Sequence, residues 1–169
     1  IYLVSDRHKA CSGTLEVEIM KLTGEVLSHF KRNVKVDANS SHTLFSVSLD
    51  EALKGARKED VFIHATLLTD KGNSLYTNNY FPVKQKEVNY PQAVITRSIR
   101  PIAKGFEVTL ASDNFARAVF IATGDVDSSF SDNYFDILPG GSVKVEVYTD
   151  LPQDRFEKQL KVVSLSDEY

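Results

Sequence analysis

The sequence predicts an all-β protein built from two consecutive β-sandwich domains. Apolar and polar residues alternate in short segments along most of the chain, which is the pattern of half-buried strands. Turn residues separate these segments, and helical periodicity is scarce. A polar stretch punctuated by prolines lies near the middle of the 169 residues. We place the domain boundary there, between a first domain at residues 1–83 and a second at residues 84–169.

The first half contains a series of strands joined by turns. Residues 14–21 alternate cleanly, with the aliphatic side chains on one face. The turn at residues 70–73 predicts a hairpin between the two strands that flank it. One helical turn is expected at residues 48–55, with Asp50 as its cap and Gly55 as its end. The other strands expected in this half are residues 26–30, 34–36, 44–49, 61–68 and 75–81.

The second half continues the strand pattern and adds a turn with a specific geometry. Pro139 and Gly140 fit the central positions of a type II turn, because proline fixes φ and glycine accepts a positive φ. After this turn Val143, Val145 and Val147 are expected to face a core. A Pro-Gly turn before alternating valines is typical of immunoglobulin-like sandwiches. The strands expected in this half are residues 93–99, 106–111, 118–122, 143–149 and 159–165.

Composition and charge limit the classes of partner. The formal net charge is −3, so the basic excess of a nucleic-acid-binding protein is missing. No apolar run approaches the ~20 residues of a membrane-spanning helix. We therefore expect neither nucleic acid nor membrane as a partner. The chain opens at Ile1 without a signal peptide, and we expect it to be a fragment of a longer protein.

The sequence contains no recognisable catalytic or metal-binding motif. Cys11 is the only cysteine, and the four histidines lack the spacing of a zinc motif. Nucleophile elbows, P-loops and dinucleotide-binding glycine patterns are also missing. We therefore predict no catalytic residue, no metal and no cofactor. An acidic cluster could supply calcium ligands, but Asp side chains also cap turns, which is the interpretation we favour. The cluster consists of Asp125, Asp127, Asp132 and Asp136.

Aromatic side chains are the remaining candidates for ligand binding. Sugar binding without catalysis requires aromatic platforms, and Tyr76, Tyr80 and Tyr134 are the candidate glycan contacts. The chain has no Trp, and most of its 10 Phe and 7 Tyr are expected to fill the two cores. A carbohydrate-binding module therefore remains the alternative to a structural role.

The segment S-D-N-Y-F-D-I-L-P-G-G at residues 131–141 resembles a known family motif. It is similar to the "sDNyFdLlPGe" segment in the C-terminal immunoglobulin-like domain of β-mannosidases from glycoside hydrolase family 2. Ile137 and Gly141 are the two departures from that motif. Flanking pieces at residues 109–117, 164–169 and 4–17 also resemble the family, in the same order. The motif loop is expected to be structural, with Asp132, Asn133, Tyr134, Phe135, Asp136, Pro139 and Gly140 as its members.

The resemblance implies two non-catalytic accessory sandwiches from the C-terminal end of a multidomain enzyme. In such enzymes two glutamates on an earlier barrel domain release terminal, non-reducing β-mannose with retention of configuration. No position of this chain matches those glutamates. The resemblance implies that the partners are the catalytic barrel and the other domains of the same polypeptide. It also leads us to expect a periplasmic or secreted bacterial protein.

Overall fold

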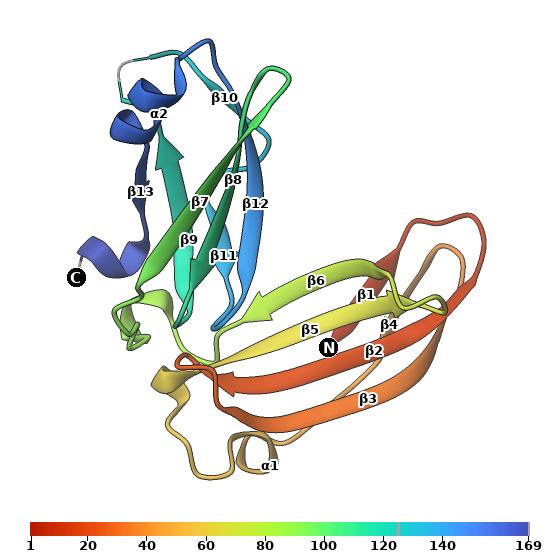
Figure 1. The fold of residues 1–169 in the computed structure, drawn as a ribbon. Helices are drawn as coiled ribbons and strands as arrows, with labels where there is room; N and C mark the ends of the chain where they lie inside the picture. The colour runs from red at the N-terminus through yellow and green to blue at the C-terminus, as the bar shows by residue number, and fades with distance from the viewer. Residues whose placement is uncertain (125, 169) are drawn as a thin grey trace. The chain divides into compact units, whose positions relative to one another are not determined.

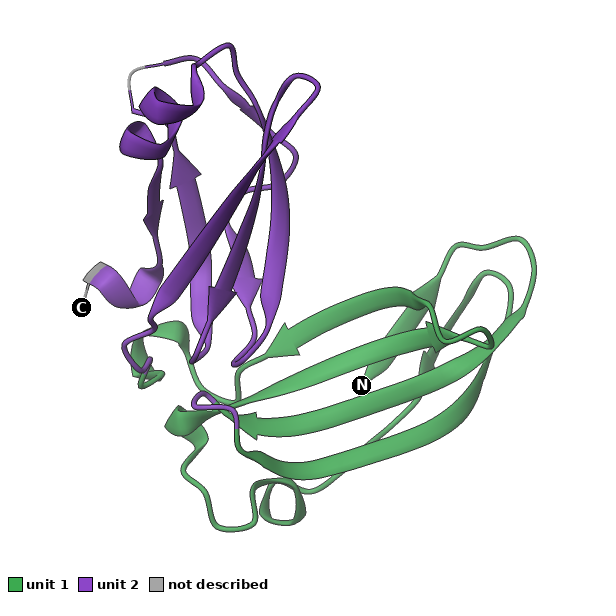
Figure 2. Ribbon diagram, viewed as in Figure 1, with its two compact units in different colours: residues 1–21, 25–89 green, residues 22–24, 90–169 purple. Residues whose placement is uncertain are grey.

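The structure is a computed structural model that describes residues 1–124 and 126–168. Antiparallel strands dominate it, which confirms the predicted all-β class. The chain divides into two compact units, coloured separately in Figure 2. The first unit comprises Ile1–Lys21 and Glu25–Asn89, and the second comprises Leu22–Gly24 and the residues from Tyr90 onward.

The first unit contains a four-stranded sheet, a two-stranded sheet and one short helix (Figure 1). The larger sheet has the strand order β3-β2-β5-β6, and the smaller pairs β1 with β4. The bounds are β1 (Tyr2–Ser5), β2 (Cys11–Lys21), β3 (Val26–Val36), β4 (Ser40–Thr43), α1 (Leu49–Leu53), β5 (Val61–Thr69) and β6 (Ser74–Tyr80). The 3-10 turns η1 (Lys58–Asp60) and η2 (Gln85–Glu87) follow α1 and β6, respectively.

The core of the first unit lies against the middle of its larger sheet. Leu15, Val17 and Ile19 on β2 are buried, as their alternation predicts. Phe45 packs on this face with its ring 5.0 Å from that of Phe30. The side chains of α1 that complete the cluster are Ala52 and Leu53. The core therefore covers β2 and β5 much better than the edge strand β6, whose residues are almost all exposed.

The second unit is a sandwich of a four-stranded and a three-stranded sheet (Figure 1). The strand orders are β10-β12-β8-β7 and β11-β9-β13. The bounds are β7 (Ile95–Ile102), β8 (Gly105–Ser112), β9 (Ala116–Ala122), β10 (Ser129–Phe130), β11 (Phe135–Ile137), β12 (Ser142–Tyr148), α2 (Gln153–Gln159), β13 (Lys161–Val163) and η3 (Leu165–Glu168). Val145 and Val147 on β12 are fully buried and Val143 is half-buried, as predicted.

Two strand predictions in the first unit are wrong. Residues 26–30 and 34–36 belong to the single strand β3, which continues through a polar run. The run is tolerated because β3 is an edge strand, and Arg32 within it lies over the Phe45 ring at 5.1 Å. Residues 44–48 form no strand, although Phe45 is buried. Only the start of the segment continues the pairing of β4 with β1: the Leu44 amide donates to the Ile1 carbonyl at 2.9 Å, and the Ile1 amino group donates to the Phe45 carbonyl at 2.6 Å. The rest is a loop that crosses the core.

The helix of the first unit begins two positions earlier than the predicted cap implies. Ser48, not Asp50, is the N-cap, and its hydroxyl accepts a hydrogen bond from the Glu51 amide at 3.3 Å. Asp50 lies in the first helical turn, where a carboxylate also suits the helix dipole. The helix ends where expected, because Lys54 and Gly55 both have positive φ, at 49° and 86°.

The second unit contains a helix where the sequence predicts the start of a strand. Residues 153–159 form α2, and only Lys161–Val163 of the predicted strand at 159–165 is extended. Phe156 is the only buried residue of α2, so the helix has no apolar stripe that would show a helical period. The amide of Leu160 closes the helix by donating to the carbonyl of Phe156 at 2.8 Å.

Candidate functional site

The motif loop attaches to strand β9 through the side chain of Asn133. Its Oδ1 accepts a hydrogen bond from the Ile121 amide at 2.8 Å, and its Nδ2 donates to the Ile121 carbonyl at 2.9 Å. The same Oδ1 accepts from the Tyr134 amide at 3.1 Å. The neighbouring strand β11 pairs with β9 only as far as Val119. Asn133 therefore continues the ladder with a side chain in place of a backbone partner.

Asp136 performs a similar task at an irregular point of β9. Ala118 has a positive φ of 48°, and the register of β11 against β9 shifts at this place. One carboxylate oxygen of Asp136 accepts from the Ala118 amide at 3.1 Å, and the other forms an ion pair with Arg117. Both partners of the ion pair are at most about a third exposed. The carboxylate thus stabilises a backbone conformation that non-glycine residues rarely adopt.

The tetrad S-D-N-F at residues 112–115 uses the same chemistry as S-D-N-Y at residues 131–134. Asp113 accepts hydrogen bonds from the amides of Val94 at 2.8 Å and Asn114 at 2.7 Å. The Asn114 side chain then donates to the Gln92 carbonyl at 2.9 Å. In the motif loop Asp132 accepts from the Asn133 amide at 2.8 Å. In both tetrads an aspartate shapes the turn, and an asparagine fastens it to another segment.

These contacts support turn capping as the role of the acidic cluster. Asp132 and Asp136 bind backbone amides and Arg117, while Asp127 is exposed. Asp125 lies outside the described residues, as does Tyr169 at the end of the closing motif. Within the described ranges, no group of three or more His, Cys, Asp or Glu residues could hold a metal ion.

The Pro-Gly turn has the geometry that its residues predict. The Gly141 amide donates to the Leu138 carbonyl at 2.8 Å, and Gly140 has a φ of 70°. This combination defines a type II turn with Pro139 and Gly140 at its centre. The Gly140 amide also donates to the Ser112 carbonyl at 2.8 Å, which joins the turn to the end of β8.

The three candidate glycan contacts do not form one site. Tyr76 and Tyr80 lie on β6 in the first unit, and Tyr134 lies in the motif loop of the second. Tyr134 is 68% exposed and packs against Phe120, with the ring centroids 4.9 Å apart. Its neighbour Phe135 instead points to the core of the second unit.

Tyr76 lines a hollow of about 300 Å³ in the first unit. The wall opposite β5 and β6 comes from β1 and the residues that follow it, including Tyr2, Asp6 and Arg7. Tyr80 is not part of the lining. The sequence prediction did not include Tyr2, because its strand is only four residues long and pairs with the equally short β4.

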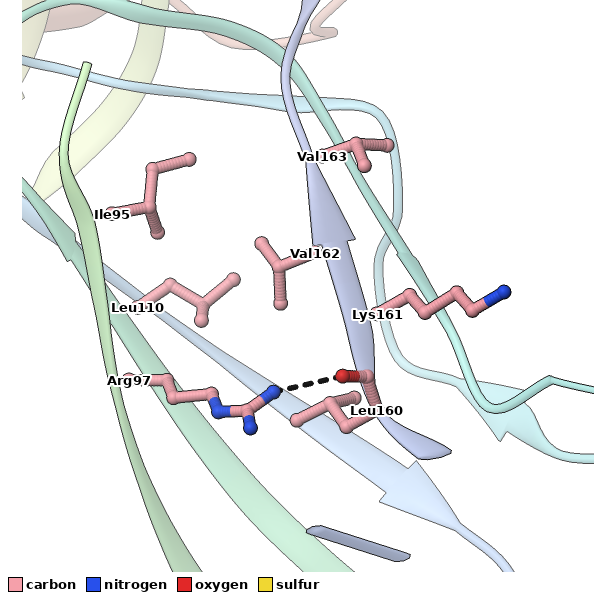
Figure 3. A pocket seen from close by; sticks show the side chains of 7 residues that line it. All are labelled: Ile95, Arg97, Leu110, Leu160, Lys161, Val162 and Val163. Atoms are coloured by element: carbon pink, nitrogen blue, oxygen red, sulfur yellow. Dashed lines mark hydrogen bonds between the residues drawn. The ribbon is translucent and has the colours of Figure 1, made fainter. Parts of the chain in front are cut away.

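A larger hollow of about 420 Å³ lies in the second unit, between the edge strands β7 and β13 (Figure 3). Its inner wall is formed by side chains of the sandwich core, such as Leu110 and Val162. Arg97 spans it, donating to the carbonyls of Leu160 at 2.8 Å and Glu157 at 3.2 Å. Arg97 therefore links the edge strand β7 to the end of α2, directly before β13, and we interpret this hollow as the seam of the sandwich. No sequence signal distinguishes Arg97 from other strand arginines.

The shifted pKa values of Glu16, Arg100 and Glu107 belong to surface ion pairs, and the pKa of Tyr148 is raised by its hydrogen bond to Glu146. The guanidinium of Arg100, 3.1 Å from Glu107, holds the pKa of that carboxyl below its usual value. Lys144, at 3.6 Å, acts in the same direction. Lys31 lowers the pKa of Glu16 in the same way across β2 and β3. These pairs link neighbouring strands and are not part of either hollow.

The fold and its loops define a pair of immunoglobulin-like β-sandwich domains. A family model described as "Mannosidase Ig/CBM-like domain" matches residues 1–87, and one described as "Ig-fold domain" matches residues 88–168. The chain therefore belongs to the mannosidase Ig/CBM-like domain family, and an Ig-fold domain follows the family's domain in the sequence. These matches confirm the immunoglobulin-like prediction and the family resemblance seen in the motif loop. Comparison with curated proteins found no match.

Solved structures of glycosidases contain the same pair of folds. A β-D-mannosidase from Dictyoglomus thermophilum aligns with 97% of this chain at 21% identity and a TM-score of 0.76. The exo-chitosanase CsxA from Amycolatopsis orientalis aligns with 96% at 14% identity and a TM-score of 0.59. The chain spans 20% of the first protein and 25% of the second. Neither helix in the described part of this chain has the length and apolar character needed to cross a membrane.

Proposed function

We propose that the chain is an accessory part of a β-mannosidase and stabilises that enzyme by packing against its other domains. The observation that carries the proposal is the alignment of nearly the whole chain with only 20% of a β-D-mannosidase. A catalytic (β/α)8 barrel needs about 250 residues, more than the 169 present. The chemistry proposed for the longer protein is release of terminal β-mannose with retention, by an acid/base carboxyl and a nucleophilic carboxylate. We propose a periplasmic or secreted location for it.

An apolar patch on the second unit supports the packing role. Phe120 and Val163 are paired across β9 and β13, so their side chains share the outer face of the three-stranded sheet. Tyr134 packs on Phe120 and widens this patch. Tyr134 and Val163 are 68% and 40% exposed, although large apolar side chains favour burial. Another domain of the same polypeptide is the partner that the fold relatives favour, because most of their length lies outside this segment.

The isolated chain is expected to release no 4-nitrophenol from 4-nitrophenyl β-D-mannopyranoside. The reason is that the described residues contain no barrel and no metal or nucleophile constellation that could replace it. Absorbance at saturating substrate, with an active β-mannosidase as positive control, measures this directly. Turnover that co-purifies with the chain through two unrelated chromatographic steps would contradict the proposal.

Replacing Tyr134 with serine is expected to destabilise the longer polypeptide more than the isolated chain. If a neighbouring domain covers the ring, its removal costs about 1–3 kcal/mol in the longer protein and little in the isolated chain, where the ring is exposed. Thermal inactivation of β-mannosidase activity and thermal unfolding of the chain give the two values. Lys161→Ser on the outer face of the same sheet is the matched control. Equal effects of Tyr134→Ser in both proteins would contradict packing at this patch.

A further inference from the structure

The hollow in the first unit exists because one sheet of the unit is wider than the other. The ribbon of β1 and β4 faces a sheet of four strands, so the inner face of the edge strand β6 is left uncovered. Tyr76 is opposite Leu67 and Tyr80 is opposite Ile63, so both tyrosines point to the core side of the sheet. They are nevertheless 65% and 61% exposed. The sequence thus places two large rings on an open inner face.

The hollow brings aromatic rings and hydrogen-bonding groups together. Its volume of about 300 Å³ lies at the lower end of the range for ligand pockets. Tyr2 on β1, which is 76% exposed, and Tyr76 on β6, which is 65% exposed, both line it. Leu67 contributes to its floor and is almost fully buried. This arrangement offers flat apolar surfaces around a small cavity.

The polar groups of the hollow are available to a ligand. Among the described residues, none forms an ion pair with Asp6 or with the guanidinium of Arg7, and none bonds the hydroxyls of Tyr2 and Tyr76. The segment that carries Asp6 and Arg7 is tied to the turn before β4, because the Asn39 amide donates to the Arg7 carbonyl at 3.0 Å. A carboxylate only accepts hydrogen bonds, and a guanidinium only donates them. Their charges are opposite, so together they favour a neutral ligand with many hydroxyl groups.

We propose that this hollow is a binding subsite for a neutral pyranose sugar. Tyr2 and Tyr76 would contact the apolar faces of the ring, while Asp6 and Arg7 would bond its hydroxyls. Tyr80 lies four residues beyond Tyr76 on the same face of β6, about 13 Å further along the strand. It would contact a later sugar of a bound chain, so the preferred ligand is an oligosaccharide. The choice of β-mannan as the first probe rests on the proposed function, whereas the subsite rests on the geometry.

Titration of the 15N-labelled chain with β-1,4-mannohexaose tests the subsite. The expected result is saturable shifts of amide signals of Tyr2, Arg7 and Tyr76, with a dissociation constant of roughly 0.1–5 mM. Tyr76→Ala and Tyr2→Ala are each expected to weaken binding at least about tenfold, which corresponds to ~1.4 kcal/mol. Both rings are exposed, so these variants should keep the dispersed spectrum of the folded chain. Tyr148→Ala, an exposed tyrosine of the second unit, is the matched control and should bind normally.

A parallel titration with cellohexaose separates the subsite from the identity of the enzyme. Binding of either oligosaccharide with loss in Tyr76→Ala supports the subsite, and the preferred sugar then defines its specificity. The subsite is overturned if neither oligosaccharide shifts these signals at about 10 mM, or if binding is unchanged in both tyrosine variants. The proposed function fails independently, if the longer polypeptide does not hydrolyse β-mannosides.

Discussion

Replacement of Phe156 with alanine is expected to lower the free energy of unfolding of the second unit by about 3–5 kcal/mol. Phe156 is fully buried, and its ring stacks on that of Phe106 with the centroids 4.2 Å apart. It is also the only buried residue of α2, so its loss leaves a cavity and detaches the helix from the core. Urea unfolding followed by the amide signals of β8 and β9 measures the change in this unit.

Two further variants separate cavity formation from loss of the helix. Phe156→Leu keeps most of the buried volume and should cost much less than the alanine variant, about 1–1.5 kcal/mol. Lys158→Ala keeps the helix propensity and removes only an exposed side chain, so it should change stability by less than about 0.5 kcal/mol. A loss below about 1 kcal/mol in Phe156→Ala would show that α2 contributes little to the core.

Alternation predicts the strands well wherever one face is buried and the other meets solvent. β2, β8 and β12 follow this rule, and their predicted positions agree with the structure. The strand expected at residues 61–68 is also present as β5, but it is apolar along most of its length and its burial does not alternate. The rule fails for residues 44–48, where Phe45 is buried by a loop that crosses the core. It also fails for α2, because a helix anchored by one side chain has no repeating pattern to detect. An alternating pattern therefore shows which side chains are buried, but it does not show whether the segment pairs with a neighbouring strand.

In the candidate sites, too, the sequence predicts the type of residue involved but not the distant residue that it contacts. Asp132 and Asn133 are predicted as turn residues from their side chains alone, whereas the bond to Ile121 joins positions 12 residues apart. Asp136 reaches Ala118 across 18 residues. Tyr76 is a candidate from its residue type, but the hollow also needs Tyr2, which lies on a different strand. Such partners become visible only when the topology brings the strands together.

Asn133→Ala is expected to destabilise the second unit by about 2–4 kcal/mol. The substitution removes both hydrogen bonds to Ile121 and the bond to the Tyr134 amide. Each bond contributes about 1 kcal/mol net, and a desolvated backbone group left without a partner adds about 1–3 kcal/mol. Chemical unfolding gives the total loss. Native-state hydrogen exchange should show the largest acceleration at the Ile121 amide, because this group loses its acceptor.

Asn133→Asp is the more specific test of the donated hydrogen bond, because it replaces the Nδ2 donor with an oxygen and leaves the shape of the side chain unchanged. A carboxylate can still accept from the amides of Ile121 and Tyr134, but it cannot donate to the Ile121 carbonyl. It also places negative charge beside that carbonyl oxygen, 2.9 Å from the replaced nitrogen. At neutral pH the variant should therefore be destabilised, with an Ile121 amide that remains more protected than in Asn133→Ala. Protonation of the new carboxyl restores a donor, so the pKa of this carboxyl should be raised. The loss of unfolding free energy of the variant, relative to the wild-type chain, should therefore shrink as the pH falls. Identical stability of Asn133→Asp and the wild-type chain at neutral pH would show that the donated bond does not hold the loop, and the acceptor bonds would then carry the attachment alone.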